Sequence, residues 1–333
     1  MSMLENIWYQ KPWYRWPLML LLGPVTILFA AIAWSRRHAF AWGLIASHKI
    51  SAPVIIVGNI SVGGNGKTPL VIHLAQLLKQ QGLRPGVLSR GYGGKSAHYP
   101  LTVLPDSSPT IVGDEPVLMK QHLGCPMVVD PNRPRGARFL VENHHCNLII
   151  CDDGLQHYAL ERDIEIAVMD GKRRVGNGFL LPMGPLREGQ QRLASVDFVV
   201  VNGGSDNDGE HLMELEPGSL VNVKNPSRSQ PLSQLCNPVV AIAGIGNPQR
   251  FFNLLLNASV KLKQCLIFAD HHQFTAEDLP RETLLMTEKD AVKCRDFAFD
   301  DWWYLPVSAK LTANFEQQLL SKLRNLKREK DGL

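Results

Sequence analysis

Eight consecutive residues combine the groups that hold a nucleoside triphosphate: three glycines, a lysine and a threonine. Glycines let backbone N–H groups turn toward phosphate oxygens, the lysine reaches the terminal phosphates, and the threonine hydroxyl is a Mg²⁺ ligand. The usual pattern of such a loop begins with glycine, whereas this one begins with serine. We predict that the loop binds ATP through Ser61, Val62, Gly63, Gly64, Asn65, Gly66, Lys67 and Thr68.

A second group of candidates consists of carboxylates. Residues 148–151 are apolar and are followed at once by Asp152 and Asp153. This is the pattern expected of a neighbouring strand whose acidic end holds Mg²⁺ beside a phosphate-binding loop. Asp114 and Glu115 form another acidic pair at the start of an expected helix. The plain interpretation of that second pair is a helix cap and a first-turn carboxylate favoured by the helix dipole.

Two further side chains could act on a phosphoryl group or on its acceptor. Arg187 lies in a Pro- and Gly-rich segment, where a guanidinium could stabilise phosphate charge. His271 follows an apolar run, where a histidine is either structural or orients and tunes a catalytic carboxylate. For His271 the spacing alone leaves both interpretations open.

The elements around these residues predict a doubly wound parallel α/β sheet of the P-loop NTPase type. Residues 53–57 form a short β-branched run before the Gly-rich loop, and apolar residues recur at helical spacing after the loop. Similar runs alternate with helical stretches, and ligands bind where the strands of such a sheet end. Further strands are expected at 85–89, 127–129, 148–151, 164–169 and 198–201.

A polar stretch at 202–209 ends this alternation, and a second alternation begins beyond it. A length of 333 residues also suggests about two domains. Strands of the second, smaller α/β domain are expected at 239–243, 266–269, 284–286 and 303–306. We therefore predict a membrane-associated hydrophobic segment at 1–48, a P-loop kinase core at 49–205, and a smaller α/β domain with a C-terminal helix at 206–333.

The first fifty residues carry the whole net charge of +4, because five basic residues there face Glu5 alone. Between Arg15 and Arg36 lie twenty uncharged residues, about the length that a helix needs to cross a membrane. Five of the seven tryptophans lie before residue 43, and indole rings favour the membrane–water boundary. The segment therefore predicts contact with a membrane.

Three arrangements of this segment stay open: a helix or helix pair inserted into one leaflet, a spanning helix, and a buried core helix. The break expected at Gly23 and Pro24 favours insertion into one leaflet. A cleaved signal peptide is disfavoured because the apolar run has no small-residue cleavage site.

The six cysteines lack zinc-type spacing, and reduced thiols beside a nucleotide site indicate the cytosolic side. Balanced charge elsewhere argues against a nucleic-acid-binding surface.

The ordered set of motifs resembles one family, the tetraacyldisaccharide 4′-kinases, which are the lipid A 4′-kinases of Gram-negative bacteria. The matching segments run in order over nearly the whole chain, and the hydrophobic N-terminus also fits. The serine that opens the loop looks like this family's own version of the pattern. The segments lie at 58–68, 89–93, 113–116, 152–157, 185–188, 270–272 and 287–290.

The resemblance implies a lipid kinase with ATP and Mg²⁺ as cofactors. Such an enzyme transfers the ATP γ-phosphate to the 4′-hydroxyl of tetraacyldisaccharide 1-phosphate and gives the 4′-phosphorylated lipid A precursor, lipid IVA. It also implies an active site in the crevice between two α/β domains, at the cytoplasmic face of the inner membrane. The expected partner is the lipid substrate, with neither nucleic acid nor an evident protein partner.

The resemblance further implies roles for single residues. Asp114 resembles the family's catalytic aspartate and His271 its histidine partner, so Asp114 would accept or guide the hydroxyl proton. Lys67 and Arg187 would neutralise charge on the transferred phosphoryl group. Three oxygen ligands would hold Mg²⁺: Thr68, Asp152 and Glu115.

Two other classes of protein stay open at this point. A membrane-associated GTPase would carry an N/T-K-x-D motif, but here the lysine comes one place late, at Lys289. A non-catalytic ATPase that positions a partner on the membrane would carry an early loop lysine, where this loop has Val62. Both comparisons favour the kinase.

Overall fold

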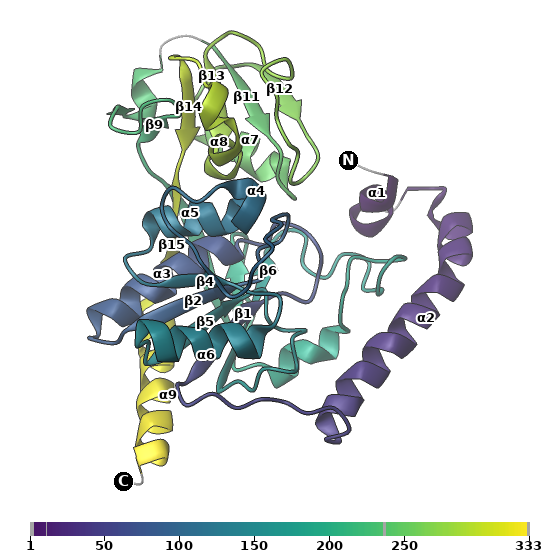
Figure 1. The fold of residues 1–333 in the computed structure, drawn as a ribbon. Coiled ribbons are helices and arrows are strands. Elements are labelled where there is room, and N and C mark those ends of the chain that lie inside the picture. Colours follow the sequence, from purple (N-terminus) through teal and green to yellow (C-terminus); the bar gives the residue numbers. More distant parts are fainter. Residues whose placement is uncertain (1–2, 11, 236–237, 332–333) are drawn as a thin grey trace.

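The chain folds around two β-sheets, as the computed structural model in Figure 1 shows. The structure describes residues 3–10, 12–235 and 238–331. Met1, Ser2 and Lys11 of the predicted membrane segment lie outside the described residues. The first sheet carries the Gly-rich loop, and the second lies beyond the end of the first where that loop is found.

Within the described residues the first sheet has nine strands, and its central strands are parallel. The β-branched runs form this centre because a strand covered on both faces needs apolar residues at every position. The two edge strands, β3 and β15, run antiparallel to their neighbours. In spatial order the strands are β15 (Val307–Leu311), β8 (Glu210–Pro217), β7 (Phe198–Asn202), β6 (Ile164–Asp170), β1 (Val54–Gly58), β5 (Leu148–Asp152), β2 (Pro85–Ser89), β4 (Met127–Val129) and β3 (Leu101–Thr102).

Helices cover both faces of this sheet, which is the doubly wound arrangement that the sequence predicts. Adjacent residues of β1 face opposite ways: Ile55 belongs to one apolar core and Ile56 to the other. The core around Ile55 is shared with α3 (Lys67–Gln80), α5 (Asp114–His122) and α9 (Ala313–Asp331). The core around Ile56 is shared with α6 (Arg133–His144).

The helix after the Gly-rich loop illustrates why the local pattern is a reliable guide here. Leu70, Leu74 and Leu78 of α3 are four residues apart and therefore lie on one face, and all three are fully buried. Burial of each leucine side chain contributes about 2 kcal/mol. That face anchors α3 against the sheet and thereby fixes the loop at its N-terminus.

The second sheet has six strands in the described residues, and helices α7 (Pro248–Asn257) and α8 (Glu288–Cys294) accompany it. The expected strand at 266–269 runs instead from Leu262 to Ile267, so its predicted bounds were wrong. This strand is at the sheet edge and largely exposed, so its pairing did not require an apolar run. The strands, in spatial order, are β10 (Ser229–Gln230), β9 (Leu220–Asn222), β14 (Trp302–Leu305), β13 (Leu284–Thr287), β11 (Val239–Ala243) and β12 (Leu262–Ile267).

The chain crosses between the sheets more than once. Strands β8 and β15 form an antiparallel pair at the edge of the first sheet, and α9 packs into the first core. All three elements lie beyond residue 206, so segments distant in sequence complete the first sheet. The division of the chain into units at 49–205 and 206–333 stays a prediction.

The N-terminal segment forms a short helix, α1 (Met3–Tyr9), and a long one, α2 (Arg15–Ala41). The break expected at Gly23 and Pro24 was wrong, because α2 is one helix of 27 residues with Pro24 inside it. A proline removes one backbone hydrogen bond, which a long helix can tolerate. By length and composition α2 could cross a membrane, and 11% of its most apolar window is buried.

Candidate active site

The Gly-rich loop joins β1 to α3 and is braced by side-chain contacts. Gly66 has a φ of 94°, and a Cβ there would lie 2.1 Å from the amide nitrogen of Asn202. Only glycine therefore fits this position. The Asn202 amide donates to the Asn65 carbonyl at 3.0 Å, and the Asn65 amide donates to the Ser61 hydroxyl at 3.1 Å. Ser61 thus has a bracing contact that a glycine at that position would lack.

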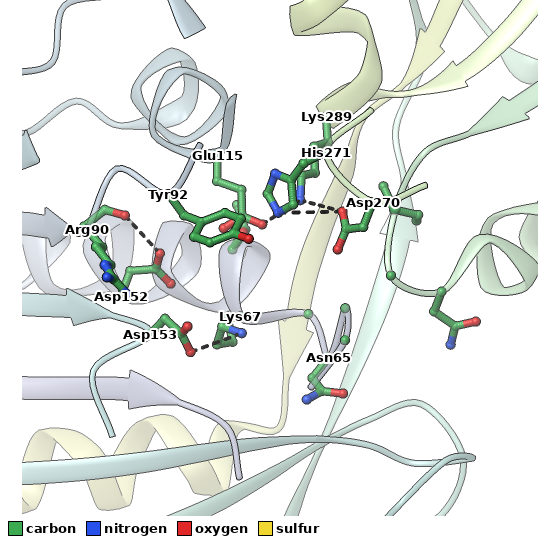
Figure 2. A pocket seen from close by; sticks show the side chains of 18 of the residues that line it. Asn65, Lys67, Arg90, Tyr92, Glu115, Asp152, Asp153, Asp270, His271 and Lys289 are labelled. Carbon is green, nitrogen blue, oxygen red and sulfur yellow. Dashed lines mark hydrogen bonds and ion pairs between the residues drawn. The ribbon is translucent and has the colours of Figure 1, made fainter. Parts of the chain in front are cut away.

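Asp153 contacts both of the predicted phosphate-binding cations, and Figure 2 shows its contact with Lys67. Its carboxylate lies 3.4 Å from Lys67 Nζ and 3.0 Å from Arg187 Nη1. Burial alone would raise the pKa of Asp153, but the positive charges of Lys67 and Arg187 bring it well below its ordinary value. The ionised carboxylate holds both cations beside the loop. In the sequence Asp153 is half of an acidic pair, and no pattern there predicts this role for it.

Asp152 ends β5, directly beside the strand that carries the loop, and is 2% exposed. Ser89 Oγ donates to its Oδ2 at 3.3 Å, while Oδ1 has no hydrogen-bond partner among the described residues. Burial, and then the negative charge of Glu115, raise the pKa of Asp152 to about 7, against the opposing charge of Lys67. A buried carboxylate oxygen without a partner, near a second carboxylate, suits a divalent cation.

The side-chain oxygens of Thr68, Glu115 and Asp152 suit Mg²⁺ better than a metal whose ligands all come from the protein. Thr68, Glu115 and Asp152 line one cavity. In the part of the chain that the structure describes, three or more His, Cys, Asp or Glu side chains nowhere gather as a metal site. Mg²⁺ commonly takes one or two carboxylates and completes its shell with water and substrate phosphates.

Asp114 and His271 are 157 residues apart but lie in contact. Nδ1 of His271 is 3.1 Å and 3.0 Å from the two carboxylate oxygens of Asp114. Gly113 makes the turn into α5 possible, because its φ is 96° and a Cβ there would lie 2.6 Å from the Tyr92 carbonyl oxygen. The Tyr92 ring packs 4.9 Å from the His271 ring, on the cavity side (Figure 2).

The two members of this pair shift each other's protonation. The hydrogen bond to Asp114 raises the pKa of His271, while burial and the charge of Lys289 oppose that shift. Burial would raise the pKa of Asp114, but the hydrogen bond from His271 and the charge of Lys289 bring it below its ordinary value. Asp114 is therefore an aspartate held by a donating imidazole, and it is 5% exposed.

Lys289 connects the pair to the neighbouring carboxylates, a role that sequence analysis missed. Its Nζ lies 2.8 Å from Glu115 Oε1, 3.1 Å from Asp270 Oδ1 and 3.3 Å from His271 Nε2. Thr287 caps the helix α8 and so places Lys289 in its first turn. The motif at 287–290 could have pointed to this role. It was used only as part of the family resemblance, and no chemistry was predicted for its lysine.

One cavity of about 880 Å³ joins these groups. It is lined by the loop from Gly63 to Thr68, by the strand ends of both sheets, and by one face of α2. Asp114 is not a lining residue and meets the cavity through His271. Ser61 and Val62, at the start of the predicted loop, do not line it either. The lining includes the other predicted site residues, Gly63, Gly64, Asn65, Gly66, Lys67, Thr68, Glu115, Asp152, Arg187 and His271, and the α2 residues Phe29, Ile32, Ala33 and Arg36.

Comparison with known proteins identifies the family. Residues 18–324 match the family model described as LpxK, tetraacyldisaccharide-1-P 4′-kinase. The chain belongs to this kinase family. A tetraacyldisaccharide 4′-kinase of Pseudoalteromonas atlantica is 66% identical over 304 residues, which cover 91% of this chain and 100% of that protein. A tetraacyldisaccharide 4′-kinase of Tolumonas auensis is 50% identical over 329 residues, 98% of each chain.

The fold agrees with a solved member of the kinase family. The crystal structure of LpxK from Aquifex aeolicus, in complex with ATP, superposes with a TM-score of 0.75 at 30% identity. The match covers 92% of this chain and 99% of that one. The family and the α/β fold class that the motifs predicted are therefore confirmed. The GTPase and the partner-positioning ATPase are no longer needed as alternatives.

Proposed function

We propose that this chain is an ATP-dependent tetraacyldisaccharide 4′-kinase. It transfers the γ-phosphate of ATP to the 4′-hydroxyl of tetraacyldisaccharide 1-phosphate, a step of lipid A biosynthesis. The observation that carries the proposal is the cavity, because the Gly-rich loop, His271 and apolar residues of α2 all line it, and His271 contacts Asp114 just behind the lining. A lipid kinase needs these three surfaces together: a nucleotide site, a group that receives a hydroxyl proton, and an apolar approach.

In the proposed reaction the 4′-oxygen forms a bond to the γ-phosphorus while the bond to the β–γ bridging oxygen breaks, and ADP leaves. The hydroxyl proton passes to the Asp114 carboxylate, which His271 Nδ1 holds in place at 3.0 Å. Phosphoryl transfer depends mainly on positioning and charge neutralisation, so a modest base suffices. Lys67 and Arg187 then pair with the phosphate oxygens instead of with Asp153 and neutralise their charge.

Mg²⁺ would be held by Thr68, Asp152 and Glu115, which line the same cavity. When bound, it neutralises charge on the β- and γ-phosphates. The partnerless Oδ1 of Asp152 supports this assignment, because a buried acceptor without a donor is costly unless a ligand completes it. The Glu115 carboxylate that would serve the cation is ion-paired with Lys289 at 2.8 Å.

We also propose that α2 lies in the cytoplasmic face of the inner membrane. Its exposed apolar side chains include Leu20 at 81% and Ile27 at 72%, and burial of such side chains in lipid favours insertion. The full chain should float with vesicles of anionic phospholipid. The double variant Leu20→Glu/Ile27→Glu should remain in the aqueous fraction, while the control Leu104→Glu, at an exposed position outside α2, should float normally. Flotation of the double variant would contradict the assignment.

The direct test of the function is a phosphoryl-transfer assay in detergent. The purified full chain, with Mg-ATP labelled at the γ-phosphate, should transfer label to tetraacyldisaccharide 1-phosphate. The same lipid with a blocked 4′-hydroxyl should stay unlabelled, and GTP should be a poor donor. Absence of label on any glucosamine lipid would overturn the proposed function.

A further inference from the structure

A second set of polar contacts joins the two sheets, next to the Gly-rich loop. Asp170 ends β6, which pairs directly with the strand β1 that leads into that loop. Asn247 Nδ2 donates to Asp170 Oδ2 at 2.9 Å, and the Arg250 guanidinium pairs with the same oxygen. Asn247 precedes α7 of the second sheet and Arg250 lies in its first turn. We call Asp170, Asn247 and Arg250 the clasp.

The carboxylate of the clasp is rigidly placed on its own side. Asp170 is 1% exposed, and its Oδ1 accepts from the backbone N–H groups of Lys172 and Arg173, each at 2.9 Å. The Arg173 guanidinium crosses to the second sheet and donates to the Gly246 carbonyl at 2.8 Å. Charge-assisted bonds of this kind are short and directional. The first turn of α7 is therefore held against the first sheet by side chains from both.

The clasp also brings the backbone of the second sheet onto the Gly-rich loop. Residues 244–247 connect β11 to α7, and a Cβ added to Gly246 would lie 2.5 Å from the backbone nitrogen of Gly64. Only backbone can approach that closely, so the two glycines form a contact without side chains. The position of α7 thus decides how residues 244–247 cover the loop.

A series of contacts continues from the clasp to His271. The Gly244 N–H donates to Asp290 Oδ2 at 2.9 Å, and Asp290 is a fully buried residue of α8. The preceding residue, Lys289, lies 3.3 Å from His271 Nε2 and 2.8 Å from Glu115. Rigid elements joined by such contacts can transmit a displacement from one end to the other. Movement of α7 should therefore reach His271 through residues 244–247 and α8.

We propose that Asp170 and Arg250 are positioning residues for phosphoryl transfer. Their ion pair holds the second sheet where residues 244–247 cover the Gly-rich loop and His271 reaches Asp114. The inference rests on the proposed function, in which His271 orients Asp114. Arg250 also lines the cavity, so it could instead contact the nucleotide directly. The positioning role and this direct role make different predictions.

A double-mutant cycle between Arg250 and His271 separates these two roles. If Arg250 acts through His271, Arg250→Met should lower kcat about tenfold in the wild-type background and have almost no further effect in His271→Ala, because coupled residues are non-additive. The Kd of ATP, measured by equilibrium binding, should stay close to that of the wild type. Arg250→Lys keeps the charge and should recover part of the lost kcat.

Further variants guard against simple misfolding. Asp170→Asn keeps the shape and one acceptor oxygen for the N–H groups of Lys172 and Arg173, and it should reproduce the loss of kcat. Lys263→Met, which breaks an exposed ion pair with Glu282 elsewhere on the second sheet, should behave like the wild type. Thermal melting of each variant reports whether the fold persists.

The outcomes distinguish the clasp from the proposed function. An additive loss in the cycle, or a Kd of ATP that rises in step with the loss of kcat, would overturn the clasp and leave Arg250 as a nucleotide contact. Full activity of Arg250→Met and Asp170→Asn would also overturn it. Full activity of His271→Ala would instead refute the orienting role of His271 in the proposed function, and the clasp with it.

Discussion

The nucleotide side and the acceptor side of the cavity are assembled in different ways. The four charged groups assigned to the nucleotide side belong to the first sheet: Lys67 follows β1, Asp152 and Asp153 lie at the end of β5, and Arg187 is tied to the segment after β1 by its backbone N–H. On the acceptor side Asp114 belongs to α5, whereas His271 follows β12 of the second sheet.

This difference separates binding from chemistry. Neighbouring strands of one parallel sheet fix the nucleotide groups relative to one another through the backbone hydrogen bonds that join them. The pair of Asp114 and His271 depends instead on how the second sheet sits against the first, which the contacts of Asp170 with Asn247 and Arg250 and the close approach of Gly246 to Gly64 help to fix. Changes on the acceptor side should therefore lower kcat with little effect on the affinity for ATP.

The largest effect expected on the acceptor side comes from Asp114→Asn. The amide keeps the shape of the side chain but cannot receive the hydroxyl proton, so kcat should fall about 10³-fold, within the usual range for general base catalysis. Equilibrium binding of ATP should be nearly unchanged. Asp106→Asn, at an exposed position, is the matched control. A variant that loses ATP binding as severely as turnover would erase the distinction between the two sides.

The same difference explains how much of the molecule the sequence could predict. The loop and β1 were predictable because the pattern that forms them is local: a β-branched run, glycines, then leucines four residues apart. The meeting of Asp114 with His271 spans 157 residues and was predicted only through a family resemblance. The contact of Asp170 with Arg250 was missed, because no local sequence pattern predicts which distant carboxylate pairs with an arginine in the first turn of a helix.

An intermediate effect is expected from Lys289→Met. Its ammonium contacts His271 on the acceptor side, and it also neutralises Asp270 and Glu115, the carboxylate assigned to Mg²⁺. Its removal should lower kcat by about tenfold, the rate equivalent of losing one charge-assisted hydrogen bond. The affinity for ATP, measured in the absence of Mg²⁺, should stay close to that of the wild type. Steady-state kinetics and equilibrium binding measure the two quantities.

The control for Lys289→Met is again Lys263→Met, whose ion pair with Glu282 is exposed on the second sheet. If both variants lost activity equally, loss of a lysine anywhere in the second sheet would explain the result. If Lys289→Met weakened ATP binding without changing kcat, Lys289 would belong to the nucleotide side.

The smallest effect concerns His122, which joins α5 to α8 on the acceptor side through a 2.7 Å contact with Glu288. This hydrogen bond raises the pKa of His122, and burial opposes it. A raised pKa in the folded state means that the folded protein favours the protonated ring. The stabilisation is then complete below the ordinary pKa of 6.5 and disappears as the pH rises through the raised value.

His122→Gln should therefore lower the free energy of unfolding by about 0.5 kcal/mol in mildly acidic solution, since the pair is partly exposed and screened by solvent. In alkaline solution the difference should vanish, because the wild-type ring is then neutral as well. Urea denaturation at both pH values measures it, with His98→Gln at an exposed position as the control. A loss that is the same at both pH values would mean that the imidazole acts by packing. A loss confined to acidic solution would mean that protonation tightens the contact between α5 and α8, the helices that carry Asp114 and Lys289.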